Sequence, residues 1–255
     1  KVIADKLEAW GLAFNFIDAV YGKELSVNQL ADFNFTCLHA RKGYSPTPGE
    51  IGCTLSHINV YSKFFEDNHK WACVLEDDAI IDEKFAMFCK NFNPEDLDRN
   101  EDNALYILGG QNGLNCEPYV AKSRWNNKEI GGQKFAKTIK SEKYIYRTCC
   151  YLLNVNLCRN LRTLFSKEFF LADEWHYFRQ NNVFKEVYLA NFVEHPVDLS
   201  SSYLEIERRA AQNLASEANA RNRSRLKKAI KLCVNTQRVK RVFLILRAKA
   251  LSLIP

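Results

Sequence analysis

The stretch WACVLEDDAII at residues 71–81, preceded by GEIGCTLSH at residues 49–57, decides how this chain is organised. Residues 41–50 read as a loop, residues 51–68 as a helix, and residues 72–75 as a short buried strand. Three carboxylates, Glu76, Asp77 and Asp78, then follow inside an apolar run. Burying adjacent acids is costly unless a partner neutralises them, and a hard divalent cation with oxygen ligands fits best.

The overall composition is that of a folded protein. The chain has 255 residues, 47% of them hydrophobic, which is enough for one sizeable core. It has no apolar run of transmembrane length and no secretory signal pattern. Most of the nine cysteines stand in apolar contexts, so we interpret them as reduced core thiols of a cytosolic protein. No Cys-x-x-Cys pair occurs, which argues against a zinc site built on cysteines.

Charge is distributed unevenly along the chain. Residues 204–255 carry 13 Lys/Arg against 3 Asp/Glu, whereas residues 1–203 are mildly acidic. We therefore divide the chain into a catalytic domain, 1–203, and a basic helical extension, 204–255. Within the extension, residues 238–254 combine an apolar helical stripe with flanking basic residues, which favours a helix lying on an anionic membrane surface. The alternative is a docked helix with a solvated basic face.

Hydrophobic periodicity alternates between helix and strand along most of the chain. It predicts helices over 1–12, 25–30, 51–68, 83–92, 155–166 and 171–179, and strands over 14–20, 72–75, 104–110, 144–154 and 187–193. Residues 111–143 show little periodicity and are predicted to form a long, partly mobile loop. This order is typical of an α/β domain with a mostly parallel central sheet flanked by helices. Such a domain normally begins with a strand, so we expect its first strand to precede residue 1.

Several polar groups fall at the ends of predicted strands. In open α/β sheets, sites form beyond the carboxyl ends of the strands. The groups at those ends are Asp18, the acids at 76–78, Gly109 with Gly110, and His195. We expect them to converge on a single site.

Within the acidic run, strand alternation would place Glu76 and Asp78 on one face and Asp77 on the other. Two carboxylates on one face can share a metal ion; the alternative is a surface turn of acids. His195 could be a third ligand, since neutral imidazole binds Mn²⁺, or a strand-end histidine satisfied by the backbone. His57 could belong to the same site, or it could be a partly buried histidine of the predicted helix; its local sequence favours neither.

Asp173 and Glu174 precede a predicted helix, where acids commonly cap the helix N-terminus. Local sequence favours capping, and the alternative for Asp173 is a general base that deprotonates an acceptor hydroxyl. The chain has no glycine-rich phosphate loop. A metal ion would therefore carry most of any phosphate binding.

Three motifs in order, FIDAVYG at 16–22, GEIGCTLSH at 49–57 and VLEDDA at 74–79, closely resemble glycosyltransferase family 25. The resemblance covers roughly residues 7–199, and the middle motif is its most specific part. The family contains bacterial lipooligosaccharide galactosyltransferases and collagen galactosyltransferases. The resemblance implies a GT-A-like fold, an inverting mechanism and a UDP-hexose donor.

The resemblance also assigns site residues. Glu76-Asp77-Asp78 stands where GT-A enzymes carry Asp-x-Asp, with Glu in the first position. It implies that Glu76 and Asp78 hold Mn²⁺ or Mg²⁺ on the diphosphate and that His195 completes the metal site. Asp18 would face uridine, and Asp173 would be the base. The remaining donor-binding candidates are Ser56, His57 and Asp77.

The resulting hypothesis is a hexosyltransferase that moves galactose or glucose from a UDP-sugar to a lipooligosaccharide or lipopolysaccharide core. We expect it in the bacterial cytoplasm, peripheral on the inner face of the inner membrane through 238–254, with no nucleic-acid partner. One alternative is a metal-dependent phosphohydrolase or nucleotidyltransferase that uses the same acids. Another is a non-catalytic module that binds membrane or nucleic acid through its tail.

Overall fold

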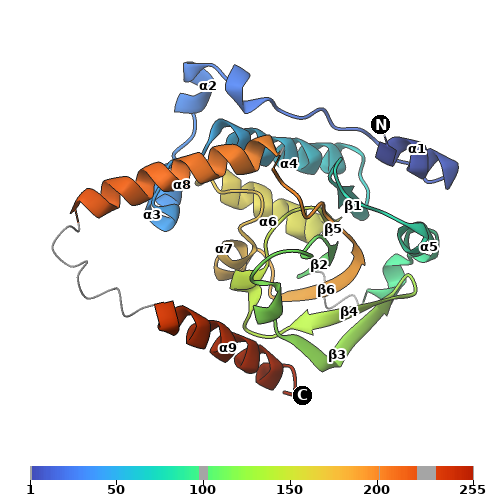
Figure 1. Ribbon diagram of the computed structural model, residues 1–255. Coiled ribbons are helices and arrows are strands. Elements are labelled where there is room, and N and C mark those ends of the chain that lie inside the picture. Colours follow the sequence, from blue (N-terminus) through green and yellow to red (C-terminus); the bar gives the residue numbers. More distant parts are fainter. Residues whose placement is uncertain (1, 98–102, 201, 223–233, 255) are drawn as a thin grey trace.

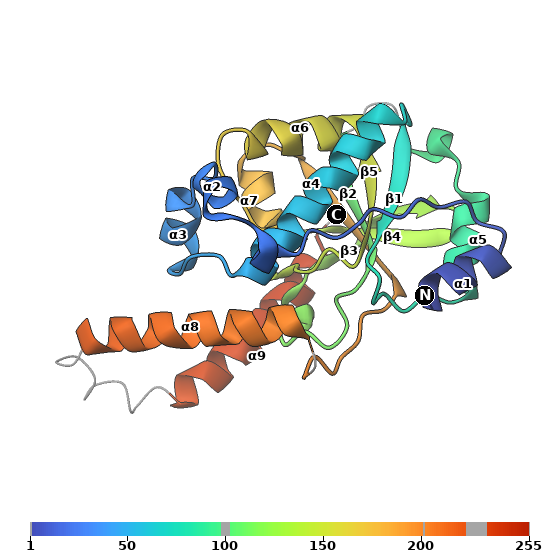
Figure 2. The same cartoon turned by 90° about the horizontal axis from the view of Figure 1, so that it is seen from above.

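The computed structural model describes residues 2–97, 103–200, 202–222 and 234–254 as a six-stranded sheet with helices on both faces (Figures 1 and 2). The strands lie in the order β1-β5-β2-β6-β4-β3. Their bounds are β1 Trp71–Leu75, β2 Ala104–Gly109, β3 Lys122–Ile130, β4 Gln133–Thr138, β5 Cys150–Asn154 and β6 Glu186–Val193.

The prediction of a mostly parallel sheet is wrong. Among the described strands only β2 and β6 pair in parallel, and the other pairings are antiparallel. The reason lies partly in residues 111–143, which form the β3–β4 hairpin instead of a long loop. Gly131 and Gly132 make its two-residue turn with φ of 54° and 75°, the left-handed conformation that such a turn requires. A hairpin reverses the chain, whereas a helical crossover would have kept the strands parallel.

The α-helices agree with the predicted ones to within a few residues at their ends, and one helix was not predicted. Their bounds are α1 Val2–Ala9, α2 Val27–Ala31, α3 Thr36–Lys42, α4 Pro48–Glu66, α5 Glu83–Asn91, α6 Val155–Phe165, α7 Trp175–Gln180, α8 Tyr203–Asn222 and α9 Val234–Leu251. The unpredicted helix, α3, begins inside a stretch without a strong apolar repeat. Short 3₁₀ turns occupy Gly22–Glu24, Pro94–Asp96, Glu117–Tyr119 and Glu142–Tyr144.

Both faces of the sheet are buried. Alternate residues of the central strands point to opposite sides, so Leu105 and Ile107 pack in one cluster while Tyr106 and Leu108 pack in the other. Helices α4, α6 and α7 cover the first face, and α5 and α1 cover the second (Figure 2). This two-sided burial explains why β2 reads as a continuous apolar run.

Helix α4 is the element that positions the site. Thr47 caps it in a reciprocal capping box with Glu50, and Pro48 occupies its first turn. The helix therefore begins three residues before the predicted start. Its buried side carries Tyr61 and Phe64 into the core on the sheet.

Residues 14–20 were predicted as a strand, and this is also wrong. The segment is extended but pairs with no described strand. It runs to α4, where the Val20 N–H donates to Ser56 Oγ at 2.9 Å. A strand needs a series of backbone hydrogen bonds to a neighbouring strand, and a serine side chain on a helix supplies only one acceptor. The segment therefore does not become a strand. Gly52 permits this approach, because a Cβ there would lie 2.4 Å from the Val20 carbonyl oxygen.

Among the described residues, no helix is long and apolar enough to cross a membrane. The described cysteines are free thiols, but they are not uniformly core residues: Cys37 and Cys73 are exposed, whereas Cys149, Cys150 and Cys158 are buried. Cys73 lies on β1, the strand at one edge of the sheet. The core-thiol interpretation therefore holds for only part of the set.

Candidate active site

A cavity with a volume of about 320 Å³ opens beside the acidic turn that follows β1. Its walls come from segments far apart in the sequence. They are α4, the turn at 76–78, Arg147 and Thr148 before β5, residues 171–173 before α7, and His195 after β6. Leu199, Ser202, Leu204, Glu205 and Arg208 complete the wall. The cavity thus brings together Ser56, His57, Glu76, Asp77, Asp78, Asp173 and His195 from the predicted set.

The three acids lie just beyond β1, not on it. The strand ends at Leu75, the Glu76 N–H still donates to the Cys149 carbonyl at 3.0 Å, and Asp77 and Asp78 form a turn. Glu76 and Asp78 therefore do not share a strand face as predicted, although they do converge. An isolated antiparallel bridge between Ile80 and Glu194 brings the turn beside His195.

Glu76, Asp78 and His195 form one cluster, with a ligand atom from each within 4.8 Å of the others. His195 Nε2 lies 3.4 Å from Asp78 Oδ2. The Nδ1 atom of His195 lies 2.8 Å from the Pro196 carbonyl, which can only accept, so Nδ1 carries the proton. In the neutral ring Nε2 then directs a lone pair toward the carboxylate. A cation between these atoms would stabilise both, so the donor set fits a divalent metal ion.

Backbone contacts fix His195 independently of its ring. Asn112 Nδ2 donates to the His195 carbonyl at 2.8 Å, and the His195 N–H donates to Asn112 Oδ1 at 2.9 Å. Partial burial raises the pKa of Asp78; the His195 charge opposes this shift, while Glu76 and Asp77 add to it. A metal ion would favour the ionised form of Asp78.

Glu76 is held from the other side of the turn. His57 Nε2 lies 3.4 Å from Glu76 Oε1, and the Thr148 hydroxyl donates to the same oxygen. Burial is the largest influence on the Glu76 pKa and raises it, but these hydrogen bonds and the nearby histidines outweigh burial. The pKa of Glu76 is therefore lowered, and the residue is ionised at neutral pH.

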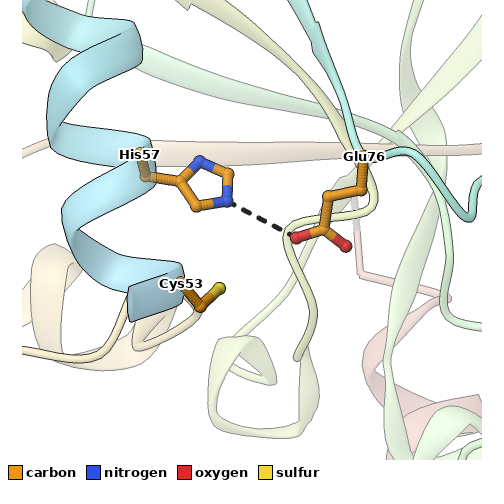
Figure 3. A group of neighbouring side chains, drawn as sticks. All are labelled: Cys53, His57 and Glu76. Carbon is orange, nitrogen blue, oxygen red and sulfur yellow. Dashed lines mark hydrogen bonds and ion pairs between the residues drawn. The ribbon is translucent and has the colours of Figure 1, made fainter. Parts of the chain in front are cut away.

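His57 is itself held by a buried hydrogen-bond chain. Its Nδ1 lies 2.9 Å from the Tyr151 hydroxyl, which donates to the Tyr61 hydroxyl at 3.1 Å. His57 projects from α4 toward Glu76, with Cys53 one helical turn away on the same side (Figure 3). His57 is therefore partly buried, as one alternative predicted, and it also contacts the acidic turn.

Asp173 does not cap a helix. Helix α7 begins at Trp175, and its N-cap residue Glu174 makes no capping hydrogen bond with its side chain. Glu174 instead contacts Arg41 and Lys42. Asp173 lines the cavity, and its Oδ2 accepts from the Arg147 N–H at 3.4 Å. The capping interpretation is wrong for both side chains.

The other donor-binding candidates differ in placement. Ser56 lines the cavity, but its hydroxyl accepts from the Val20 N–H and donates to the Gly52 carbonyl at 2.8 Å. Asp77 is exposed and lines the cavity. Asp18 is exposed and does not line it, although the adjacent Ala19 does.

Two arginines of the cavity wall were not predicted. Arg147 has φ of 64°, and its Nη1 donates to the carbonyls of Gly110 and Asn112 at 2.9 Å each. Burial lowers its pKa from the usual value, but an arginine stays charged in proteins. Among the described residues no carboxylate lies within ion-pair distance of Arg147. Gly109 and Gly110 do not line the cavity; the Gly110 carbonyl instead holds the Arg147 side chain that does.

Arg208, from the first turns of α8, is the second of these arginines. Its Nε lies 2.9 Å from Glu50 Oε1, and the Glu50 side chain is only 1% exposed. Helix α8 also contacts α4 through Glu207, which accepts from the Gly49 N–H at 2.9 Å. The start of the basic extension therefore forms part of the cavity wall, and part of the rest, 223–233, lies outside the described residues. Helical periodicity could have located α8 but not its packing against α4.

The fold and the cavity define a class of protein: an α/β domain with an acidic turn beyond a strand, a histidine and a separate acid around one pocket. Residues 1–175, more than half of the chain, match the family described as glycosyltransferase family 25 (LPS biosynthesis protein). The chain belongs to this family.

Known relatives agree with the family. The chain is 37% identical over 81 residues to procollagen galactosyltransferase 1-B of Xenopus laevis, which is 30% of this chain and 13% of that protein. It is 37% identical over 87 residues to procollagen galactosyltransferase 2 of Mus musculus, which is 32% of this chain and 14% of that protein. The matched part is thus a small fraction of each relative's length.

Proposed function

We propose that this chain is an inverting glycosyltransferase that moves a hexose from a UDP-sugar to a hydroxyl of a lipooligosaccharide or lipopolysaccharide core. The observation that carries the proposal is the meeting of Glu76, Asp78 and His195 with Asp173 in one cavity. Family membership supports glycosyl transfer, and the names of the relatives support galactose as the first donor to test. The same match argues against a phosphohydrolase or nucleotidyltransferase.

The donor diphosphate would bind at the acidic turn. Glu76, Asp78 and His195 would hold Mn²⁺ or Mg²⁺, which neutralises the charge that grows on the leaving UDP. Arg147 adds a cation on the same wall, so the metal ion need not carry all of the phosphate binding. Asp77 and Ser56 would line the donor site, and Asp18 would face uridine if the extended segment before α4 closes on the nucleotide.

Asp173 would serve as the base. The acceptor oxygen attacks the anomeric carbon from the face opposite UDP, the bond from that carbon to the diphosphate oxygen breaks, and the acceptor proton passes to Asp173. The Arg147 N–H at 3.4 Å helps to hold the Asp173 carboxylate in place. Attack in line with the leaving group inverts the anomeric centre.

The acceptor is proposed from the description of the family, which names lipopolysaccharide biosynthesis. The curated relatives are named for procollagen, so a hydroxyl on a collagen-like peptide is the second acceptor to test. Both acceptors present an alcohol to the same base.

Helix α9 supports a location at an anionic membrane surface, on the inner face of a bacterial inner membrane. One side of α9 packs on the protein, where Ala248 is buried and the Arg124 N–H donates to the Ser252 carbonyl at 3.1 Å. The opposite side exposes apolar residues, each between 53% and 68% accessible: Val239, Val242, Phe243, Leu246 and Leu253. Lys240, Arg241 and Lys249 are exposed around this stripe. An apolar stripe with basic flanks suits insertion into the headgroup region.

The transferase proposal is tested by UDP release from UDP-galactose and UDP-glucose, with and without a lipopolysaccharide core oligosaccharide or a collagen-like peptide that carries hydroxyl groups. We expect acceptor-dependent release that falls roughly 1,000-fold in Asp78→Asn. Asp32→Asn, an exposed acid remote from the cavity, is the matched control. Release that needs no acceptor, or full activity of Asp78→Asn, would contradict the proposal.

The membrane proposal is tested by sedimentation of the full chain with vesicles that contain phosphatidylglycerol. We expect Phe243→Glu to lose vesicle binding while it still transfers to a soluble acceptor. Gln237→Glu adds the same charge at an exposed position near the start of α9 and is the control. Equal binding by Phe243→Glu and the unaltered chain would exclude this role of α9.

A further inference from the structure

A second group of potential ligands lies next to the hard-ion cluster: Cys53, His57 and Glu76 (Figure 3). Cys53 and His57 are separated by four positions on α4, so they share one side of the helix. One ligand atom from each of the three residues lies within 4.8 Å of the others. The donors are a thiol, an imidazole and a carboxylate, a set that suits zinc.

The spacing of two of these donors already matches a tetrahedral zinc ion. His57 Nε2 and Glu76 Oε1 are 3.4 Å apart. Two ligands at usual zinc distances and a tetrahedral angle would be about 3.4 Å apart. A tetrahedral zinc ion would need the Cys53 sulfur about 3.6 Å from each of these two atoms. The three ligand atoms lie within 4.8 Å of one another, and a side-chain rotation of Cys53 on its helix can close the remaining gap.

The surroundings of these donors are also those of a zinc site. The Tyr151 hydroxyl lies 2.9 Å from His57 Nδ1 and can accept its proton, which leaves Nε2 free to coordinate. The Thr148 hydroxyl orients the Glu76 carboxylate. His57 is buried, and Cys53 is partly buried. Three protein ligands beside an open cavity leave a fourth position for water.

We propose that Cys53, His57 and Glu76 form a zinc site that excludes the catalytic ion, because both sites need Glu76. A soft thiolate selects zinc, whereas the oxygen-rich cluster with Asp78 and His195 suits Mn²⁺ or Mg²⁺. When zinc binds, the Cys53 thiol loses its proton to solvent and the sulfur bonds to the metal. Zinc at this site therefore inhibits the enzyme. The zinc site rests on these residues alone, while the inhibition rests on the proposed function.

Cobalt(II) in place of zinc tests the site directly, since a cobalt–thiolate bond gives a near-ultraviolet charge-transfer absorption. We expect the unaltered chain to show this absorption at one equivalent, and Cys53→Ser to lose it and bind zinc at least about tenfold more weakly. Asp78→Asn, which disrupts only the hard-ion cluster, should keep the absorption. Cys37→Ser, an exposed cysteine, is the matched control. An absorption that persists in Cys53→Ser, or none in the folded unaltered chain, overturns the site.

The exclusion is tested by the electron paramagnetic resonance signal of free Mn²⁺. One equivalent of zinc should release bound Mn²⁺ from the unaltered chain, whereas Cys53→Ser should need at least about tenfold more zinc for the same release. Retention of Mn²⁺ by the zinc-loaded chain overturns the exclusion and leaves the zinc site standing. A chain that shows the cobalt–thiolate absorption with cobalt but transfers no sugar with Mn²⁺ alone would contradict the proposed function and not the zinc site.

Discussion

The two histidines of the cavity lie at opposite ends of one acidic turn, and each places Nε2 3.4 Å from a carboxylate oxygen of that turn. Their surroundings differ. His57 stands on a helix, its Nδ1 contacts a buried tyrosine, and its partner Glu76 is mostly buried. His195 stands beyond a strand, its Nδ1 donates to a backbone carbonyl, and its partner Asp78 is 48% exposed.

The two histidine–carboxylate pairs therefore have different roles. In the buried pair, hydrogen bonds lower the pKa of Glu76 and keep it charged without a ligand. In the exposed pair, partial burial raises the pKa of Asp78, and the protein supplies too little to offset it. The Glu76 end is therefore largely organised by the protein itself, whereas under the proposed function a cation would complete the Asp78 end.

The largest effect is expected at the exposed end. His195→Ala should weaken Mn²⁺ binding roughly 100-fold, because it removes a ligand while Asn112 still holds the backbone. Thermal stability without metal should change little. The measurement is a Mn²⁺ titration followed by electron paramagnetic resonance, together with a melting curve of the metal-free protein.

His69→Ala, which removes an exposed histidine, is the control for that variant. Unchanged Mn²⁺ affinity in His195→Ala would mean that the two ends of the turn do not differ as we infer.

At the buried end we expect a loss of stability and little change in Mn²⁺ affinity. His57→Ala should lower the free energy of unfolding by about 2 kcal/mol, because it leaves the Glu76 charge and the Tyr151 hydroxyl with fewer partners. The midpoint of urea unfolding of the metal-free chain measures this loss. A variant as stable as the unaltered chain, with only its Mn²⁺ affinity reduced, would show that both histidines act primarily on the Mn²⁺ site.

The exposed end could be predicted from sequence more completely than the buried end. Acids after an apolar strand, and a histidine after another, are local signals, so Glu76, Asp78 and His195 were expected together. Their meeting depends on sheet topology, which the prediction had partly wrong, but the bridge between Ile80 and Glu194 still joins the two strand ends.

The buried end depends on packing between distant segments, which no local sequence pattern predicts. Cys53 reads as one more apolar residue of α4, and only its spacing of four from His57 hinted at a shared face. Arg147 lines the cavity from a backbone position with a positive φ, a conformation that is uncommon for arginine and that the neighbouring residues do not predict. The β3–β4 hairpin did carry a signal, because paired glycines between two short segments are typical of a tight turn.

The smallest effect is expected from a variant that removes the Tyr151 hydrogen bond to His57 and leaves the His57–Glu76 pair in place. Tyr151→Phe keeps the buried ring and removes only the hydroxyl between His57 and Tyr61, which should cost about 1 kcal/mol in the same unfolding experiment. Nitrogen NMR of the His57 ring should show a change at Nδ1, whereas the His195 ring should not change. Tyr119→Phe, at a tyrosine outside the cavity wall, is the control. If Tyr151→Phe left the His57 signal unaltered, Glu76 alone would orient the ring, and the two ends of the turn would be more alike than their burial indicates.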